Sequence, residues 1–272
     1  MKSVLFRSGR SKVKVPLMDE SKYMDIPQPD GDYPEADATI ITELASSVRW
    51  ACDTNGTGVL TGLHVDGTNV VGTSHECMCL IPVPAEVDTP VTFQTKVIGA
   101  LSGASSIHMS ADKDRIFFWL NETDWISATL FHDPYPKYEK LRRPEYQGEF
   151  KVSRWLLLEA LERMNIVMAL DRDMPRLDVT LTENMMMLNS STDEVGDSEE
   201  IVDIENGPEE EFKISYSVGM LRDAVNASAS DDLIIAWGSE KMPTKSDKVS
   251  TRITDGTGWE AYVMPRNPSK GK

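Results

Sequence analysis

The side chains best suited to chemistry lie in one short stretch, His75-Glu76-Cys77-Met78-Cys79. If this stretch is a strand, alternation places His75, Cys77 and Cys79 on one face, and imidazole and thiolate are ligands that zinc prefers. However, the sequence shows neither a fourth ligand nor a Cys-x-x-Cys pair. We therefore predict no metal site and no cofactor.

Catalytic patterns are equally sparse in the rest of the sequence. There is no Gly-rich loop that could cradle a phosphate and no nucleophile elbow. Carboxylates are plentiful, and residues 193–211 contain ten of them without a Lys or Arg. Such a run is typical of a solvated face or loop. We predict no catalytic residues and no enzyme. An acidic hydrolase with a site that one sequence does not reveal is the third-ranked alternative.

Charge and cysteine content restrict the class of protein further. The formal net charge of -16 argues against binding nucleic acid through bulk electrostatics, although it leaves room for a basic strip on an acidic body. Three cysteines indicate a reducing compartment. The sequence has no signal-peptide pattern and no run of 18 apolar residues. We therefore predict a cytoplasmic protein that does not interact with membranes.

The elements that carry these residues follow from the hydrophobic periodicity. Alternation predicts a hairpin over residues 2–17 that turns at Ser8-Gly9-Arg10. Helical spacing predicts a helix over 36–52. A hairpin over 59–65 and 70–80 follows, then a helix near 95–105 and strands over 115–120 and 125–131. Residues 131–144 hold three prolines and are predicted to be a connector.

The second half repeats this order. It is predicted to begin with a helix over 152–170 that has Trp155, Leu158, Leu161, Ile166 and Ala169 on one side. Strands over 177–181, 185–188, 201–204 and 212–214 precede a helix over 218–226, and strands over 233–237, 251–254 and 260–264 follow it. We interpret the chain as an α+β protein with two full repeats and the tail of a third. The predicted domains are 1–33, 34–146 and 147–272.

Four segments connect this repeat to a known family. Ser8-Gly9-Arg10-Ser11 resembles the end of the first domain of the bacterial DNA polymerase III β sliding clamp, and the rest of the chain resembles its second and third domains. Residues 71–77 are similar to the family's Ala-Thr-Asp-Gly-His-Arg-Leu motif, residues 133–138 to its Gly-Arg-Phe-Pro-Asp-Tyr connector, and residues 262–265 to its Val-Val-Met-Pro segment. One departure is Glu76, which is acidic where the family has a basic residue.

The resemblance implies tandem DNA-clamp domains, with antiparallel sheets outside and helices lining a ring. It implies a polymerase processivity factor that encircles double-stranded DNA without sequence preference, with the replicative DNA polymerase and a clamp loader as partners. Most of a first domain is missing, so the chain is either a fragment or a phage-type clamp, for which a homo-oligomeric ring of three subunits is expected. The expected location is then the cytoplasm, in association with the nucleoid, and a phage-type chain would be phage-encoded in a bacterial host. The runner-up is a clamp-like oligomeric binding or scaffold protein that does not encircle DNA.

The resemblance also implies two sets of site residues. Basic side chains that we place on the repeat helices are expected to face DNA: Arg49, Lys96, Lys151, Arg154, Arg163 and Arg222. A cleft between domains is expected to hold the anchor side chains of short partner peptides. Its expected residues are Leu60, Gly72, Ser74, His75, Cys77, Pro136, Leu141, Met220, Tyr262, Met264 and Pro265. For Leu60, Met220 and Met264, plain core packing is an equal alternative.

Overall fold

The computed structural model describes residues 3–17, 36–83, 90–102, 104, 106–142, 145–168, 176–192, 196–238 and 249–266. Its contacts divide the chain into two compact units, residues 1–33 and residues 34–272. The further division of the second unit at residue 146 stays a prediction. None of the helices in the described part of the chain has the length and hydropathy needed to span a membrane.

The first unit contains the predicted hairpin. Strand β1 (Ser3–Ser8) pairs antiparallel with β2 (Ser11–Pro16), and the pair Ser8 and Ser11 closes the turn. Gly9 has a φ of 59°, a left-handed conformation that glycine adopts without a steric penalty. Every described residue of the two strands is exposed. The hairpin prediction is confirmed.

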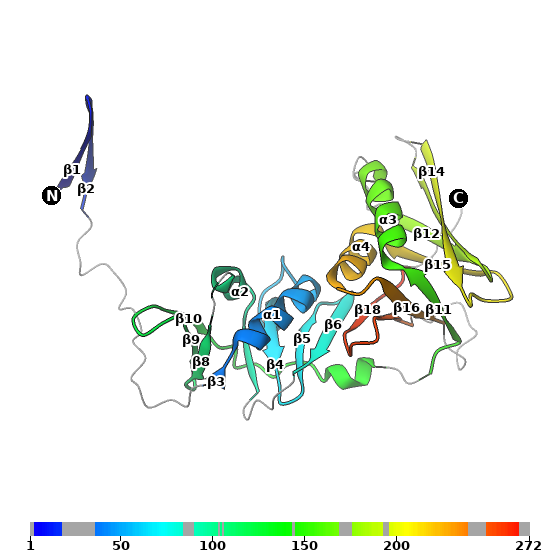
Figure 1. The fold of residues 1–272 in the computed structure, drawn as a ribbon, viewed down its shortest axis with the longest axis horizontal. Helices are drawn as coiled ribbons and strands as arrows, with labels where there is room; N and C mark the ends of the chain where they lie inside the picture. Colours follow the sequence, from blue (N-terminus) through cyan, green and yellow to red (C-terminus); the bar gives the residue numbers. More distant parts are fainter. Residues whose placement is uncertain are drawn as a thin grey trace. The chain divides into compact units, whose positions relative to one another are not determined.

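The described residues in the first half of the second unit form two α-helices and eight strands, which are drawn from blue to green in Figure 1. In chain order these are β3 (Ala36–Asp37), α1 (Thr39–Val48), the 3-10 turns η2 (Arg49–Ala51) and η3 (Val59–Thr61), β4 (Gly62–Val65), β5 (Asn69–Thr73), β6 (Cys77–Pro82), β7 (Val91–Gln94), α2 (Lys96–Leu101), β8 (His108–Ala111), β9 (Arg115–Trp119) and β10 (Trp125–Thr129). Strands β7 and β8 were not predicted from the sequence.

One predicted strand of this half is wrong. Residues 70–80 form two strands, because the backbone turns at 74–76. The Ser74 amide donates to the Cys77 carbonyl at 2.8 Å, and the Ser74 hydroxyl accepts from the amide of Cys77 at 3.3 Å. His75 is therefore an exposed turn residue and does not share a strand face with Cys77 and Cys79.

The connector and the second half contribute the remaining elements. These are η4 (Tyr138–Leu141), β11 (Gly148–Ser153), α3 (Arg154–Met168), β12 (Arg176–Leu181), β13 (Met185–Thr192), β14 (Gly196–Glu205), β15 (Phe212–Ser217), α4 (Val218–Ala227), β16 (Asp232–Trp237), β17 (Thr251–Thr254) and β18 (Glu260–Val263). The helix predicted over 218–226 is confirmed. The helix predicted from residue 152 begins at Arg154, and strand β11 before it was not predicted.

The apolar side predicted for α3 is wrong except at Leu161, which is buried. Trp155 and Ile166 are 62% and 69% exposed, whereas the helix buries Leu157, Leu161 and Met164, together with Ala160 and Met168. Leu158 is half-buried, and Ala169 lies outside the described residues. Helix α3 has apolar side chains on several of its sides. Several different apolar stripes therefore fit the helical period of 3.6 residues equally well, and the sequence does not show which of them is buried.

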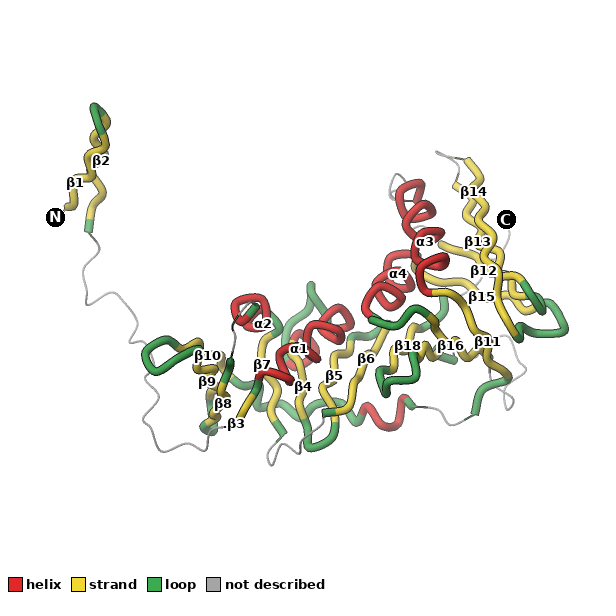
Figure 2. Tube along the Cα trace, in the orientation of Figure 1, coloured by secondary structure: helices red, strands yellow, loops and turns green. Residues whose placement is uncertain are grey.

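A single twelve-stranded sheet spans both halves of the second unit, in the order β15-β12-β13-β14-β11-β16-β17-β18-β6-β5-β4-β7. The halves join where β18 pairs antiparallel with β6. Strands β10-β9-β8-β3 form a second sheet. Helices α2, α1, α4 and α3 lie in a row along one side of the strands (Figures 1 and 2), where they cover a shared apolar core. The α+β prediction is confirmed.

Candidate partner pocket and nucleic-acid face

The junction between β6 and β18 brings distant parts of the sequence together. Val263 lies opposite Cys77, and the amide of Met264 donates to the carbonyl of Glu76 at 2.8 Å. Helix α4, which carries Met220, packs against both β18 and η2. Residues from the 74–76 turn, from β18 and from α4 therefore meet at this junction.

Close packing against α1 explains why position 72 of β5 is a glycine. A Cβ atom on Gly72 would lie 2.5 Å from the carbonyl oxygen of Val48 and 3.0 Å from Sγ of Cys52. The backbone there is held by the end of α1, and its carbonyl oxygen is not free to move aside. Gly72 therefore lets β5 approach the end of α1.

The three thiols are buried and neutral at physiological pH. Burial raises the pKa of Cys52 to about 12 and also raises the pKa values of Cys77 and Cys79. The Cys77 thiol lies 3.1 Å from the Ser74 hydroxyl, while His75 is exposed. Within the described ranges, no group of three His, Cys, Asp or Glu side chains is arranged to hold a metal ion.

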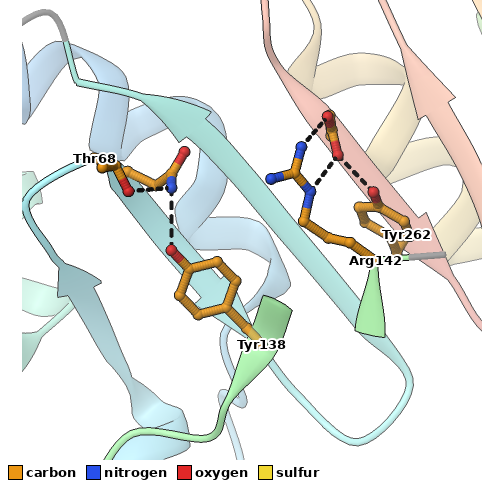
Figure 3. Close-up of polar contacts among 6 residues, drawn as sticks. Thr68, Tyr138, Arg142 and Tyr262 are labelled. Atoms are coloured by element: carbon orange, nitrogen blue, oxygen red, sulfur yellow. Dashed lines mark hydrogen bonds and ion pairs between the residues drawn. The ribbon is translucent and has the colours of Figure 1, made fainter. Parts of the chain in front are cut away.

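The connector is attached to the first half through its tyrosines. The Tyr138 hydroxyl donates to the carboxylate of Asp66. It also accepts from Nδ2 of Asn69 at 3.1 Å (Figure 3). Tyr135 stacks on His64, with ring centroids 4.3 Å apart and planes inclined by 7°. Burial and the bond to Asp66 raise the pKa of Tyr138 to about 12. The ring of Tyr138 closes a small cluster with Val71, Met78, Leu80 and Tyr262.

The far end of the connector is attached to the second half. Arg142 donates to both oxygens of Glu260, at 2.7 and 3.2 Å, and the Tyr262 hydroxyl donates to the same carboxylate (Figure 3). The hydrogen bonds that Arg142 donates to the Glu260 carboxylate raise the pKa of the guanidinium. The connector thus bridges β5 and β18 across the junction. Sequence reasoning missed Asp66 and Glu260, because a carboxylate in a turn or a strand carries no distinguishing pattern.

The structure groups most of the predicted pocket residues. Eight of them lie on or beside the β6–β18 junction: Gly72, Ser74, His75, Cys77, Met220, Tyr262, Met264 and Pro265. Pro136 and Leu141 lie on the connector, and both are exposed. Leu60 lies in η3, where its carbonyl accepts from the Asp53 amide at 2.9 Å. Among the described contacts, none joins Leu60 to the junction.

Two of the predicted DNA-facing residues have structural partners near the start of α3. Lys151 lies on β11 and not on a helix, which corrects the sequence-based placement, and its ammonium lies 2.7 Å from the carboxylate of Asp232. Arg154 donates to the carbonyls of Val225 and Asn226 at 3.1 and 3.2 Å. Arg154 therefore satisfies carbonyl groups at the C-terminal end of α4.

The other four basic residues differ in how much charge they leave available. Arg163 pairs with Glu200 at 2.7 Å, and Arg222 pairs with its neighbour Asp223 at 2.6 Å. Arg49 and Lys96 are exposed, and the described residues provide no ion pair for either. Of the six predicted residues, these two are therefore the best placed to meet an external anion.

Comparison with known proteins adds the following findings. Residues 144–251 match the family described as the C-terminal domain of the DNA polymerase III beta subunit. The beta sliding clamp of Synechococcus elongatus is 23% identical over 200 residues, which cover 68% of this chain and 53% of that protein. This chain therefore spans about half the length of the curated relative it matches.

The fold of this chain is that of solved bacterial clamps. The Caulobacter crescentus beta sliding clamp superposes with a TM-score of 0.80 at 17% identity, over 97% of this chain and 74% of that chain. The DNA polymerase III beta subunit of Thermotoga maritima gives 0.79 at 15% identity, over 98% and 74%. The tandem clamp fold and the resemblance predicted from the sequence are confirmed: this chain is similar to bacterial DNA polymerase III β sliding clamps over nearly its whole described length.

Proposed function

We propose that this protein is a DNA sliding clamp, a ring-forming processivity factor that encircles duplex DNA and tethers a polymerase. The clamp fold over nearly the whole chain is the observation that carries the proposal. The arrangement of layers supports it, because the helices lie together on one side of the strands and could line a ring (Figure 2). Topological association needs no covalent chemistry, so the proposed activity is not enzymatic.

The charge distribution is compatible with this function. A body with a net charge of -16 repels the DNA backbone at long range. Arg49 and Lys96, two exposed cations with no ion pair among the described residues, would attract phosphates only locally. Weak phosphate contacts carry no sequence information and permit sliding. We expect Arg49 and Lys96 to contribute more to DNA contact than Arg154 or Arg163, whose side chains already have acceptors.

We further propose that the β6–β18 junction binds peptides from the replicative polymerase, the clamp loader and other partners. Met220 and Met264 are half-buried there, and methionine adapts its shape to different apolar anchors. His75 and Ser74 supply polar groups at the rim. The proposed setting is the bacterial cytoplasm, on host or phage DNA.

DNA retention tests the proposal. The ring is dissociated by dilution and reassembled by concentration in the presence of nicked circular DNA, and protein that coelutes with the DNA is measured by gel filtration at increasing salt. We expect retention on the circle, loss after a single restriction cut, and retention on linear DNA with blocked ends. Equal retention on open linear and circular DNA would indicate surface binding. A ring that is not retained on either would favour the scaffold alternative.

A further inference from the structure

The turn at residues 74–76 places one carboxylate beside the proposed peptide site. Glu76 is exposed in this turn, and its carbonyl accepts from the amide of Met264 at 2.8 Å. Met264 and Met220 are both half-buried at this junction. Because the backbone of Glu76 is bonded to that of Met264, a peptide that packs apolar side chains on these methionines passes close to Glu76.

Hydrogen bonds fix the backbone of this turn. The Ser74 hydroxyl accepts from the amides of Glu76 and Cys77 at 3.4 and 3.3 Å. The Thr73 hydroxyl donates to the Cys77 carbonyl at 3.0 Å. A group on a backbone that is already ordered loses less conformational freedom when it binds a partner. Glu76 therefore extends from a defined point at the rim of the junction.

The described residues do not neutralise the Glu76 carboxylate, which has no ion pair among them. Three arginines are carried by neighbouring segments. Arg222 is already paired with the adjacent aspartate on α4, at 2.6 Å. Arg49 lies on η2, and the amide of Arg266 donates to the Ser215 carbonyl on β15 at 2.7 Å. The charge of Glu76 is therefore available to a bound peptide.

A second carboxylate lies close to the same thiol. Asp223 follows Met220 by three residues on α4, so their side chains share one face of the helix. Burial is the main cause of the raised pKa of Cys77, and repulsion from the carboxylates of Glu76 and Asp223 raises it further. Asp223 is paired with Arg222. The junction around Cys77 is thus acidic, and Glu76 supplies the carboxylate that is not paired.

We infer that Glu76 selects partner peptides that carry a lysine or arginine next to their apolar anchors. This inference rests on the proposed binding of peptides at the β6–β18 junction and names the chemistry of those peptides. A cation beside the anchors would pair with the Glu76 carboxylate, whereas a carboxylate in the same place would meet a like charge. The selection therefore has an attractive and a repulsive component.

Fluorescence anisotropy with synthetic peptides tests the inference on the full-length chain. Labelled hexapeptides contain leucine and phenylalanine as anchors, and lysine, glutamine or glutamate is placed in turn at each other position. At 0.15 M salt, exposed charges more than about 8 Å from the peptide are largely screened. At one position we expect lysine to bind about fivefold tighter than glutamine, and glutamate about fivefold more weakly, the upper range for a solvated ion pair.

Three variants separate Glu76 from the overall charge of the protein. Glu76→Gln keeps the backbone carbonyl that binds Met264 and should remove most of the preference. Glu76→Lys should reverse the preference at the same position. The matched control is Glu122→Lys, which makes the same charge change at an exposed turn and should keep the wild-type order. An unchanged order in Glu76→Lys, or a reversed order in Glu122→Lys, would overturn the inference.

A zero-length cross-link locates the contact. A carbodiimide joins a lysine amine to a carboxylate that it touches, with loss of water. The lysine peptide should therefore form an amide with Glu76 that mass spectrometry identifies, and this product should be absent from Glu76→Gln. Cross-links to other carboxylates alone would contradict the inference.

The outcomes also distinguish this inference from the proposed function. If all peptides bind equally well and Met220→Ala weakens all of them, the inference fails while peptide binding at the junction stands. If wild-type protein binds none of the peptides, both fail. Retention on circular DNA tests encirclement of DNA independently of either result.

Discussion

Replacing Tyr138 by Phe removes one hydroxyl from the anchor of the connector. That hydroxyl donates to the carboxylate of Asp66 and accepts from Asn69, while the ring stays in its apolar cluster. A hydrogen bond to a charged group contributes about 1.5–3 kcal/mol to stability. Because Asp66 is half-buried, we expect a loss of about 2 kcal/mol in the free energy of unfolding, toward the low end of that range.

The pH dependence of this loss identifies its cause. Burial raises the pKa of Asp66, but hydrogen bonds from Tyr138, Thr68 and Asn69 outweigh it, so the pKa in the folded protein is below 3.8. A lowered carboxyl pKa stabilises the fold above the unfolded value and ceases to do so as pH falls through the folded value. The difference between wild type and Tyr138→Phe should therefore be full at pH 7 and shrink below pH 3.8.

The assay is urea unfolding followed by tryptophan fluorescence at several pH values. Asp66→Asn provides the matched background, because an amide oxygen still accepts a hydrogen bond but carries no charge. There Tyr138→Phe should cost only about 1 kcal/mol, the value for a neutral pair. A loss below about 0.5 kcal/mol at pH 7, or the same loss at pH 3, would refute the reasoning.

Four further predictions concern other parts of the structure. Arg154→Ala should lower the free energy of unfolding by about 1–2 kcal/mol in urea denaturation, because two carbonyls at the end of α4 lose their donor. Arg49→Ala should leave stability unchanged but reduce the salt slope of DNA retention by about one, so equal slopes would contradict a phosphate contact. Arg142→Ala should cost about 0.5–1 kcal/mol, since its pair with Glu260 is partly solvated; the same loss in a Glu260→Ala background would exclude that pair as the cause. Cys52, whose pKa is raised to about 12, should react with iodoacetamide at pH 8 only after unfolding, and rapid labelling of folded protein would contradict its burial.

The elements that the sequence predicted correctly have one unambiguous period. Hairpin β1–β2 alternates except at Leu5, and α4 has a single apolar stripe. Strand β14 was predicted only over residues 201–204, because its first half is polar on both faces and gives no hydrophobic signal. Strand β11 was read into the following helix, since Val152 fits either pattern. Periodicity reports burial, so strands with exposed edges or faces are the ones it misses.

The candidate sites show the same limit. Motif similarity placed His75, Cys77, Tyr262 and Met264 in segments that the fold brings to one junction. It could not reveal that Arg154 is engaged by backbone carbonyls, because hydrogen-bond partners 71 residues away leave no trace in local sequence. For the same reason a count of basic residues overestimated the charge available on the helical side.

The pairing of β18 with β6 has a consequence for biosynthesis. Cys77 is synthesised long before Val263, so the edge of β6 stays uncovered while most of the chain emerges from the ribosome. Contacts between residues so distant in sequence form slowly, and an uncovered edge strand is prone to pair with other chains meanwhile. The first half therefore reaches its final state only when the second half has been made. In this protein, fidelity of folding depends on keeping that one edge free until β18 arrives.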